Sequence, residues 1–123
     1  MEIAYWIVAS LLSLLFAYAG GRKVAQDKER LAPLMNWVDT IPMWLVRTIG
    51  VLELLGVVGL LLPPLTGISP GIAAVAAAGF VVSQILATAL HLSRGEVRET
   101  GLNITLIALA GVAMWLAIDL WIR

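Results

Sequence analysis

The segment Leu45–Pro64, LVRTIGVLELLGVVGLLLPP, is long and apolar enough to cross a bilayer, yet it contains charged residues. A spanning helix needs roughly 20 mainly apolar residues. Arg47 lies near the start of the segment, and Glu53 lies near its middle. An acid at the centre of a spanning helix costs about 2.5–3.5 kcal/mol on insertion scales, which the apolar remainder outweighs. The segment therefore predicts a membrane helix whose buried carboxylate needs a partner.

The composition of the whole chain supports the same interpretation. Of its 123 residues, 61% are hydrophobic and 13% are charged, whereas a soluble domain averages about 45–50% and 25%. Backbone groups in lipid must hydrogen-bond internally, so the spanning segments are expected to be helices. Four of them are predicted, at about residues 3–20, 44–62, 72–92 and 102–122. The predicted fold class is all-α: a polytopic four-transmembrane-helix bundle, with residues 1–123 forming a single domain.

The charges exclude some functions and predict an orientation. The formal net charge is zero, which gives no argument for nucleic-acid binding, and the absence of cysteine excludes thiol chemistry. Seven of the eight Lys and Arg residues lie in or beside the connections between spans one and two and between spans three and four. The positive-inside rule places these connections in the cytoplasm and both termini outside, in a bacterial cytoplasmic (inner) membrane. The first span lacks a positive N-terminal flank, so it is expected to be retained rather than cleaved.

Aromatic and amphipathic residues mark the predicted membrane surfaces. Trp and Tyr rings prefer the headgroup level. The residues expected at the outer interface are Tyr5, Trp6, Trp115 and Trp121, with Trp115 alternatively in the core, and those expected at the inner interface are Trp37 and Trp44. Between spans one and two, a stripe of residues at helical spacing, interrupted by Pro33, predicts a short interfacial helix. This stripe consists of Lys28, Leu31, Leu34, Met35 and Val38.

The second span predicts where its carboxylate points. Gly50, Glu53 and Gly56 share one broad face of the helix, and small residues let a neighbouring helix approach closely. Arg47 lies six residues from Glu53, about 9 Å along the axis and rotated away from it, so a partner on another helix is expected. Polar residues at a similar depth are expected to form one hydrogen-bonded cluster. Its predicted members are Tyr18, Arg47, Glu53, Gln84, His91 and Asn103.

Two interpretations of this cluster stay open. Polar side chains can hold helices together, which is the interpretation favoured for Gln84 and Asn103. For His91, a position near the interface favours simple snorkelling of the ring toward water. For Glu53, an ionisable residue deep in a span favours a functional site.

Three stretches of the chain carry a resemblance to a known family. AYAGGRKV, LVRTIGVLELLGVVGLLLPPLTGISP and ATALHLSRGE occur in this order and contain the spacings R-x-x-G-x-x-E-x-x-G and H-x-x-R-G-E. Together they resemble the DoxX-like family of small integral membrane proteins. The resemblance implies a four-helix bundle, similarity to subunits associated with thiosulfate:quinone oxidoreduction and membrane redox complexes, and Lys23, Arg47, Glu53 and His91 as candidate site residues. One histidine cannot supply two axial ligands, so no haem is expected, nor any other metal.

The sequence leaves three functions open, and no catalytic activity of its own is expected because no phosphate loop, nucleophile elbow or metal motif occurs. The first is an accessory or scaffold subunit, whose small residues at 71–79 suit close packing against a membrane partner or a second copy. The second is a binder of a quinone or another amphipathic molecule in a crevice near Glu53 and His91. The third is a proton-coupled transporter of small molecules.

Overall fold

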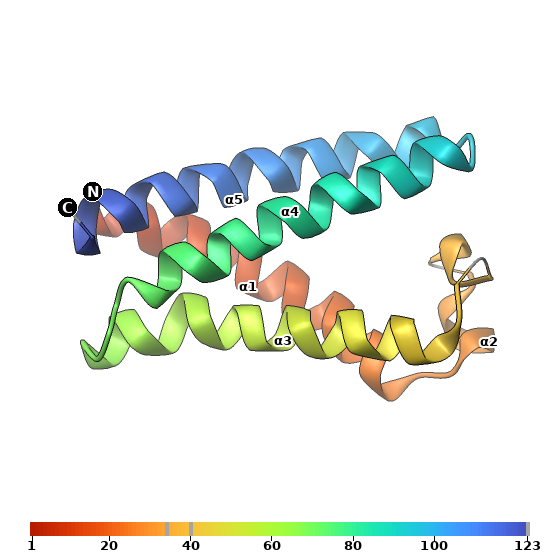
Figure 1. Ribbon diagram of the computed structural model, residues 1–123, viewed down its shortest axis with the longest axis horizontal. Coiled ribbons are helices and arrows are strands. Elements are labelled where there is room, and N and C mark those ends of the chain that lie inside the picture. The colour runs from red at the N-terminus through yellow and green to blue at the C-terminus, as the bar shows by residue number, and fades with distance from the viewer. Residues whose placement is uncertain (34, 40, 123) are drawn as a thin grey trace.

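The computed structural model describes residues 1–33, 35–39 and 41–122, and the described chain is all-α, as predicted (Figure 1). Four of its helices are long and apolar enough to span a membrane. Short helical turns connect them, and no strand occurs in the described residues. The four long helices are α1 (Glu2–Ala25), α3 (Met43–Thr66), α4 (Ile72–Ser93) and α5 (Thr100–Trp121). The short ones are α2 (Lys28–Leu31), η1 (Asn36–Asp39) and η2 (Val97–Glu99).

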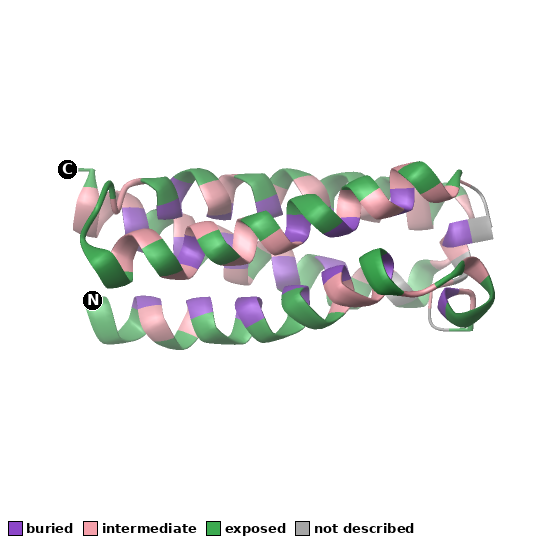
Figure 2. Ribbon diagram, turned by 90° about the horizontal axis from the view of Figure 1, so that it is seen from below, coloured by how far each residue is buried: buried purple, intermediate pink, exposed green. Residues whose placement is uncertain are grey.

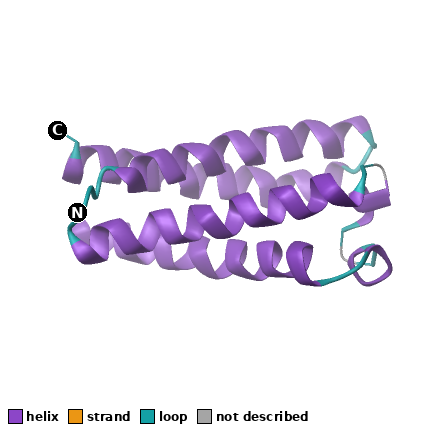
Figure 3. Cartoon of the chain, turned by 60° about the horizontal axis from the view of Figure 1, so that its bottom comes forward, coloured by secondary structure: helices purple, strands orange, loops and turns teal. Residues whose placement is uncertain are grey.

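The long helices run roughly parallel to one axis and alternate in direction, so the bundle has two distinct ends (Figures 1 and 3). The chain ends and the turn between α3 and α4 lie at one end, which we call the terminal end. Helix α2, η1 and the connection between α4 and α5 lie at the other, which we call the α2 end. Helix α1 packs on α3, α4 packs on α5, and further contacts join α3 to α4 and α1 to α5.

Side chains are distributed as expected for a protein in lipid. Large apolar side chains point outward along the four long helices, including Leu14, Leu52 and Val75, which are 72%, 60% and 70% exposed. Figure 2 shows the buried residues along the inner faces of the helices. Because lipid tails are as apolar as these side chains, no hydrophobic driving force favours burying them inside the protein.

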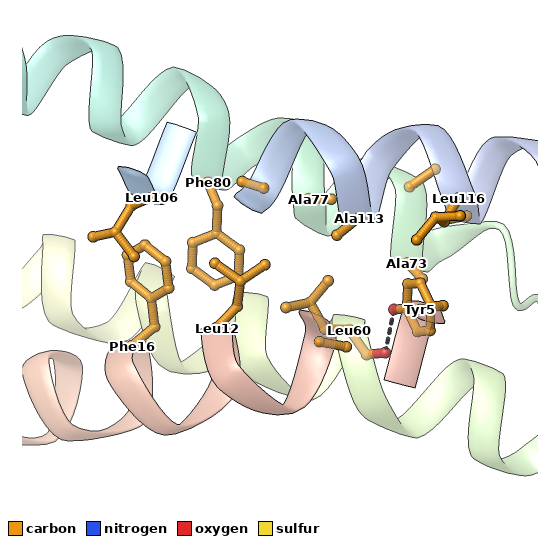
Figure 4. Packing of buried hydrophobic residues seen from close by; sticks show 14 residues of the cluster. Tyr5, Leu12, Phe16, Leu60, Ala73, Ala77, Phe80, Leu106, Ala113 and Leu116 are labelled. Carbon is orange, nitrogen blue, oxygen red and sulfur yellow. Dashed lines mark hydrogen bonds between the residues drawn. The ribbon is translucent and has the colours of Figure 1, made fainter. Parts of the chain in front are cut away.

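The core is built from small residues and a few aromatic rings. Alanines on α4 and α5 face each other inside the bundle, among them Ala73, Ala77 and Ala113 (Figure 4). Phe16 of α1 and Phe80 of α4 stack with their ring centroids 4.0 Å apart. The small-residue side of the third predicted span therefore packs, at Ala73 and Ala77, within the bundle, where small side chains let α4 and α5 approach closely.

Tyr5, predicted at the outer interface, is fully buried in this core. Its hydroxyl donates a hydrogen bond of 2.6 Å to the backbone carbonyl of Leu60 (Figure 4). Its ring meets that of Trp121 edge-on, with the centroids 4.7 Å apart. Pro64 lies four residues after Leu60 and has no N–H to donate to that carbonyl. The Tyr5 hydroxyl replaces the missing helical bond, which allows α3 to continue through two prolines to Thr66. Trp115, in contrast, is mostly exposed.

The segment between α1 and α3 differs from the predicted single interfacial helix. It forms α2 and η1, and the side chain of Asp27 caps α2 by accepting a hydrogen bond of 3.1 Å from the Arg30 amide. Leu31 and Val38 of the predicted stripe pack together with Val46 of α3, whereas Leu34 lies outside the described residues. Helix α1 continues five residues beyond the predicted end at residue 20, which places Lys23 on a helix.

Candidate functional site

Helices α1 and α3 approach each other closely at Gly20 and Gly50. A Cβ atom added to Gly50 would lie 2.7 Å from Cβ of Lys23 and 2.9 Å from the carbonyl oxygen of Gly20. Since the two helices run in opposite directions, Lys23 lies over Gly50 and Glu53 lies over Gly20. The absence of side chains at both glycines thus provides the space in which Lys23 and Glu53 meet.

Lys23 and Glu53 form a buried ion pair across this contact. Nζ of Lys23 lies 2.5 Å from Oε1 of Glu53, and the two side chains are 8% and 5% exposed. The ring of Trp37, from η1, lies over the same ammonium at 5.5 Å from its centroid. The carboxylate therefore has its partner on another helix, as predicted, but that partner is Lys23 rather than a residue of α4 or α5.

Arg47 has a different role from Glu53. Nη1 of Arg47 donates hydrogen bonds of 2.6 and 2.9 Å to the backbone carbonyls of Lys23 and Val24, and a third bond to that of Gln26. These carbonyls lie at the C-terminal end of α1, where the last four have no partner within the helix and the helix dipole favours a cation. Arg47 therefore fixes the end of α1 against the start of α3.

A crevice of about 1080 Å³ runs along α3 and α4, with further lining residues on α1 and α5. The two helices lie closest along it where Gly56 faces Phe80 and Gly59 faces Ala76. Toward the α2 end they diverge (Figure 1). The apolar walls of the crevice include Ile49 and Leu52 of α3 and Val82, Leu86 and Ala87 of α4. Its polar lining residues are Tyr18, Lys23, Glu53, Ser83, Gln84, His91, Glu96 and Asn103.

Lys23, Glu53, Gln84 and Asn103 are more than nine-tenths buried, and the last three of them keep unpaired hydrogen-bonding atoms. No described residue donates a hydrogen bond to Oε2 of Glu53 or bonds to either side-chain amide, and Nδ2 of Asn103 is fully enclosed. Glu53 lies ten residues after the first residue of α3, and Gln84 lies nine residues before the last residue of α4. Both are therefore about 14–15 Å from the ends of their helices that lie at the α2 end. Asn103 lies roughly 10 Å closer to that end. The crevice thus holds unsatisfied hydrogen-bonding groups along its length.

His91 lies at the rim of the crevice in a compact turn that ends α4. Its Nδ1 is 3.0 Å from Oε1 of Glu96, which also accepts a bond of 2.9 Å from Nε of Arg94. Gly95 has a φ of 74°, and the amide of Glu96 donates a bond of 2.8 Å to the carbonyl of His91. The spacing H-x-x-R-G-E therefore encodes a closed helix end, in which glycine is favoured at the left-handed position.

The predicted single hydrogen-bonded cluster is thus wrong, since its members fall into separate groups. Lys23 and Glu53 form the ion pair, Arg47 caps α1, and His91 bonds to Glu96. Tyr18 is 60% exposed, and its hydroxyl accepts a bond of 3.2 Å from Arg22. Of the predicted members, Glu53, Gln84 and Asn103 are buried in the lining of the crevice.

Trp37, predicted at the inner interface, also contacts Lys23, which its position in the sequence does not indicate. Met35, Trp37 and Ile41 line the crevice from the segment before α3. One available signal for the ion pair was the matching spacing G-x-x-K at Gly20–Lys23 and G-x-x-E at Gly50–Glu53. Two such spacings on antiparallel helices place each charged residue over the glycine of the other helix.

The turn around Glu96 predicts a pH dependence at the α2 end. Hydrogen bonds from His91 and then Arg94 hold the pKa of Glu96 below its ordinary value near 4.5. A carboxyl whose folded pKa is lowered stabilises the fold above its unfolded pKa, and this contribution disappears as the pH falls through the folded pKa. We expect protection of the Glu96 amide against hydrogen exchange, corrected for intrinsic rates, to be constant at neutral pH and to fall below about pH 4.5. The same loss in Glu96→Gln would show that another group causes it.

Comparison with known proteins identifies a family for the chain. A family model described as the DoxX-like family matches residues 7–113. Comparisons with curated proteins and with solved structures gave no match. The matched region includes the ion pair, the lining of the crevice and the turn after α4. The chain therefore belongs to the DoxX-like family and is a multi-pass membrane protein with a four-helix bundle.

Proposed function

We propose that this protein binds an amphipathic small molecule, such as a quinone or a lipid, in the crevice between α3 and α4. The observation that carries the proposal is an apolar crevice of about 1080 Å³ with three buried polar side chains that are not fully satisfied. Binding sites for small molecules are typically apolar concavities of about 300–1,000 Å³ with a few converging polar groups. The polar end of the molecule would lie at Glu53 and Gln84, and its apolar part along the walls.

The position of the crevice favours a molecule that comes from the bilayer. It lies between two spanning helices whose outer faces are apolar, and Leu52, Val82 and Leu86 on its walls are exposed. We place the α2 end at the cytoplasmic leaflet, because Arg22, Lys28 and the other cations of the connections gather there. A molecule would then exchange with that leaflet sideways, between α3 and α4.

The accessory-subunit function has less support than binding. Its argument relied on small residues of α4 as a docking surface, but Ala73, Ala74 and Ala77 are buried in the core of the bundle. A surface that already packs inside the protein is not available to a partner. Association with a redox complex or a second copy would need another face.

Filling the crevice should remove the bound molecule. Ala87 is half-buried and lines the crevice one turn from Gln84, so Ala87→Phe would occupy the volume next to the polar groups. We expect mass spectrometry of protein extracted in native nanodiscs to show loss of a co-purifying amphiphile, by about tenfold or more relative to wild type. The same substitution at Ala89, which is exposed on α4 and does not line the crevice, is the matched control.

The outcome separates specific binding from bulk lipid. An amphiphile that is enriched with wild type and Ala89→Phe but absent with Ala87→Phe supports the proposal. Identical extracts from all three proteins would contradict it, because annular lipid does not depend on the crevice.

A further inference from the structure

We infer that the head group bound in this crevice is neutral and carries a hydroxyl that donates a hydrogen bond to the second carboxylate oxygen of Glu53. The inference rests on the proposed function and specifies the chemistry of its ligand. It follows from how the charges around the crevice are paired and from which hydrogen-bonding groups are left over.

The pairing of charges excludes a charged head group. Lys23 is compensated by Glu53 at 2.5 Å and covered by the ring of Trp37. Arg47 directs its Nη1 to carbonyls at the end of α1, and His91 at the rim is bonded to Glu96. Among the described residues that line the crevice, an anionic head group would find no unpaired cation and would face the Glu53 carboxylate. A cationic head group would add an uncompensated positive charge next to the neutral Lys23–Glu53 pair, which is costly at low dielectric.

The leftover groups specify the hydrogen bonds of the ligand. Oε2 of Glu53 accepts no bond from a described residue, and a carboxylate can only accept. A group that binds there must donate a proton, as a hydroxyl does and as the carbonyl of a quinone does not. The amide of Gln84, at the same depth as Glu53, can both donate to and accept from an oxygen next to that hydroxyl. These groups fit a hydroxyl beside a second oxygen atom.

This chemistry has two sources in a membrane. An aliphatic hydroxyl on an apolar body occurs in diacylglycerol, and a phenolic hydroxyl occurs in the reduced, hydroquinone form of a prenylated quinone. Both donate to a carboxylate through a charge-assisted bond, which is stronger than a neutral one. The two sources differ in ring shape and hydroxyl acidity, so direct binding measurements distinguish them.

A matched pair of probes tests the hydroxyl without changing the protein. Dodecylphenol and its methyl ether, dodecylanisole, have nearly the same apolar body, but only the phenol can donate. With the wild-type protein in nanodiscs we expect the phenol to bind about tenfold or more tightly than the ether. Glu53→Gln should bring this ratio close to one, whereas Glu2→Gln, an exposed acid at the terminal end, should leave it unchanged. Diacylglycerol and a prenylated hydroquinone, measured against the same protein, then identify the natural source.

The possible results separate this inference from the proposed function. If phenol and ether bind wild type equally and both lose binding in Ala87→Phe, the requirement for a hydroxyl is wrong, whereas the crevice remains a binding site. A failure of both probes to bind wild type more tightly than Ala87→Phe would overturn both. A preference for the phenol in wild type supports the inference even if Glu53→Gln does not fold.

Discussion

Lys23→Met is expected to lower the free energy of unfolding by about 3–5 kcal/mol, because it leaves the Glu53 carboxylate buried without its cation. Methionine keeps much of the length of the lysine side chain and removes only the charge and its hydrogen bond. The expected loss is much larger than for an exposed ion pair, which contributes about 0–1 kcal/mol. Reversible unfolding in mixed micelles of increasing denaturing detergent measures the change.

The double variant Lys23→Met, Glu53→Gln is the control for this result. With both charges absent, no buried ion remains uncompensated, and replacing a buried pair by neutral groups is often close to neutral in stability. We therefore expect the double variant to recover most of the stability that Lys23→Met loses. A stability for Lys23→Met within about 0.5 kcal/mol of wild type would show that Glu53 is solvated or paired otherwise.

Gly20→Ala is expected to destabilise the protein by about 1–3 kcal/mol, while Gly21→Ala is expected to stabilise it by about 0.5–1 kcal/mol. A Cβ at position 20 would lie 2.9 Å from the backbone oxygen of Gly50 and 3.2 Å from Cβ of Glu53, so α1 and α3 would have to separate. A Cβ at position 21 meets nothing within 4 Å and only removes backbone freedom of the unfolded chain. The same unfolding assay compares these adjacent sites.

Changes of opposite sign in the free energy of unfolding for Gly20→Ala and Gly21→Ala would confirm that α1 contacts α3 closely on one face only. The separation in Gly20→Ala should also weaken the ion pair, so Lys23→Met should cost less in that background than in wild type. Equal effects of the two alanines would contradict the close approach of the helices at Gly20 and Gly50.

The four spans could be predicted from the sequence, but two of their ends could not. Hydropathy indicates which residues suit lipid and says nothing about where helical hydrogen bonding stops. Helix α3 passes the prolines at 63 and 64 because the Tyr5 hydroxyl bonds the carbonyl of Leu60, a contact between residues 55 positions apart. Helix α1 extends to Ala25, and since the predicted helix ended at residue 20, Lys23 was assigned to a connection.

The buried carboxylate could be predicted as a feature that needs a partner on another helix, whereas the members of its cluster could not. Axial depth follows from residue number, but the rotation of each helix about its axis comes from packing. Tyr18 lies two residues before Gly20, which is about 200° around α1, so it is exposed at the edge of the crevice and bonds Arg22 instead of Glu53. His91 is held in the local turn with Glu96, which depends on the left-handed conformation at Gly95. Glu53, Gln84 and Asn103 were predicted at a similar depth and all line the crevice, although Asn103 lies roughly 10 Å closer to the α2 end.

A density map of the wild-type protein in native nanodiscs would show what lies against Glu53. We expect elongated density between α3 and α4, with one end within hydrogen-bond distance of Oε2 of Glu53 and close to the Gln84 amide, beside an intact Lys23–Glu53 pair. A map in which α3 and α4 close on each other along their whole length, or in which Glu53 faces acyl chains away from Lys23, would contradict the binding crevice.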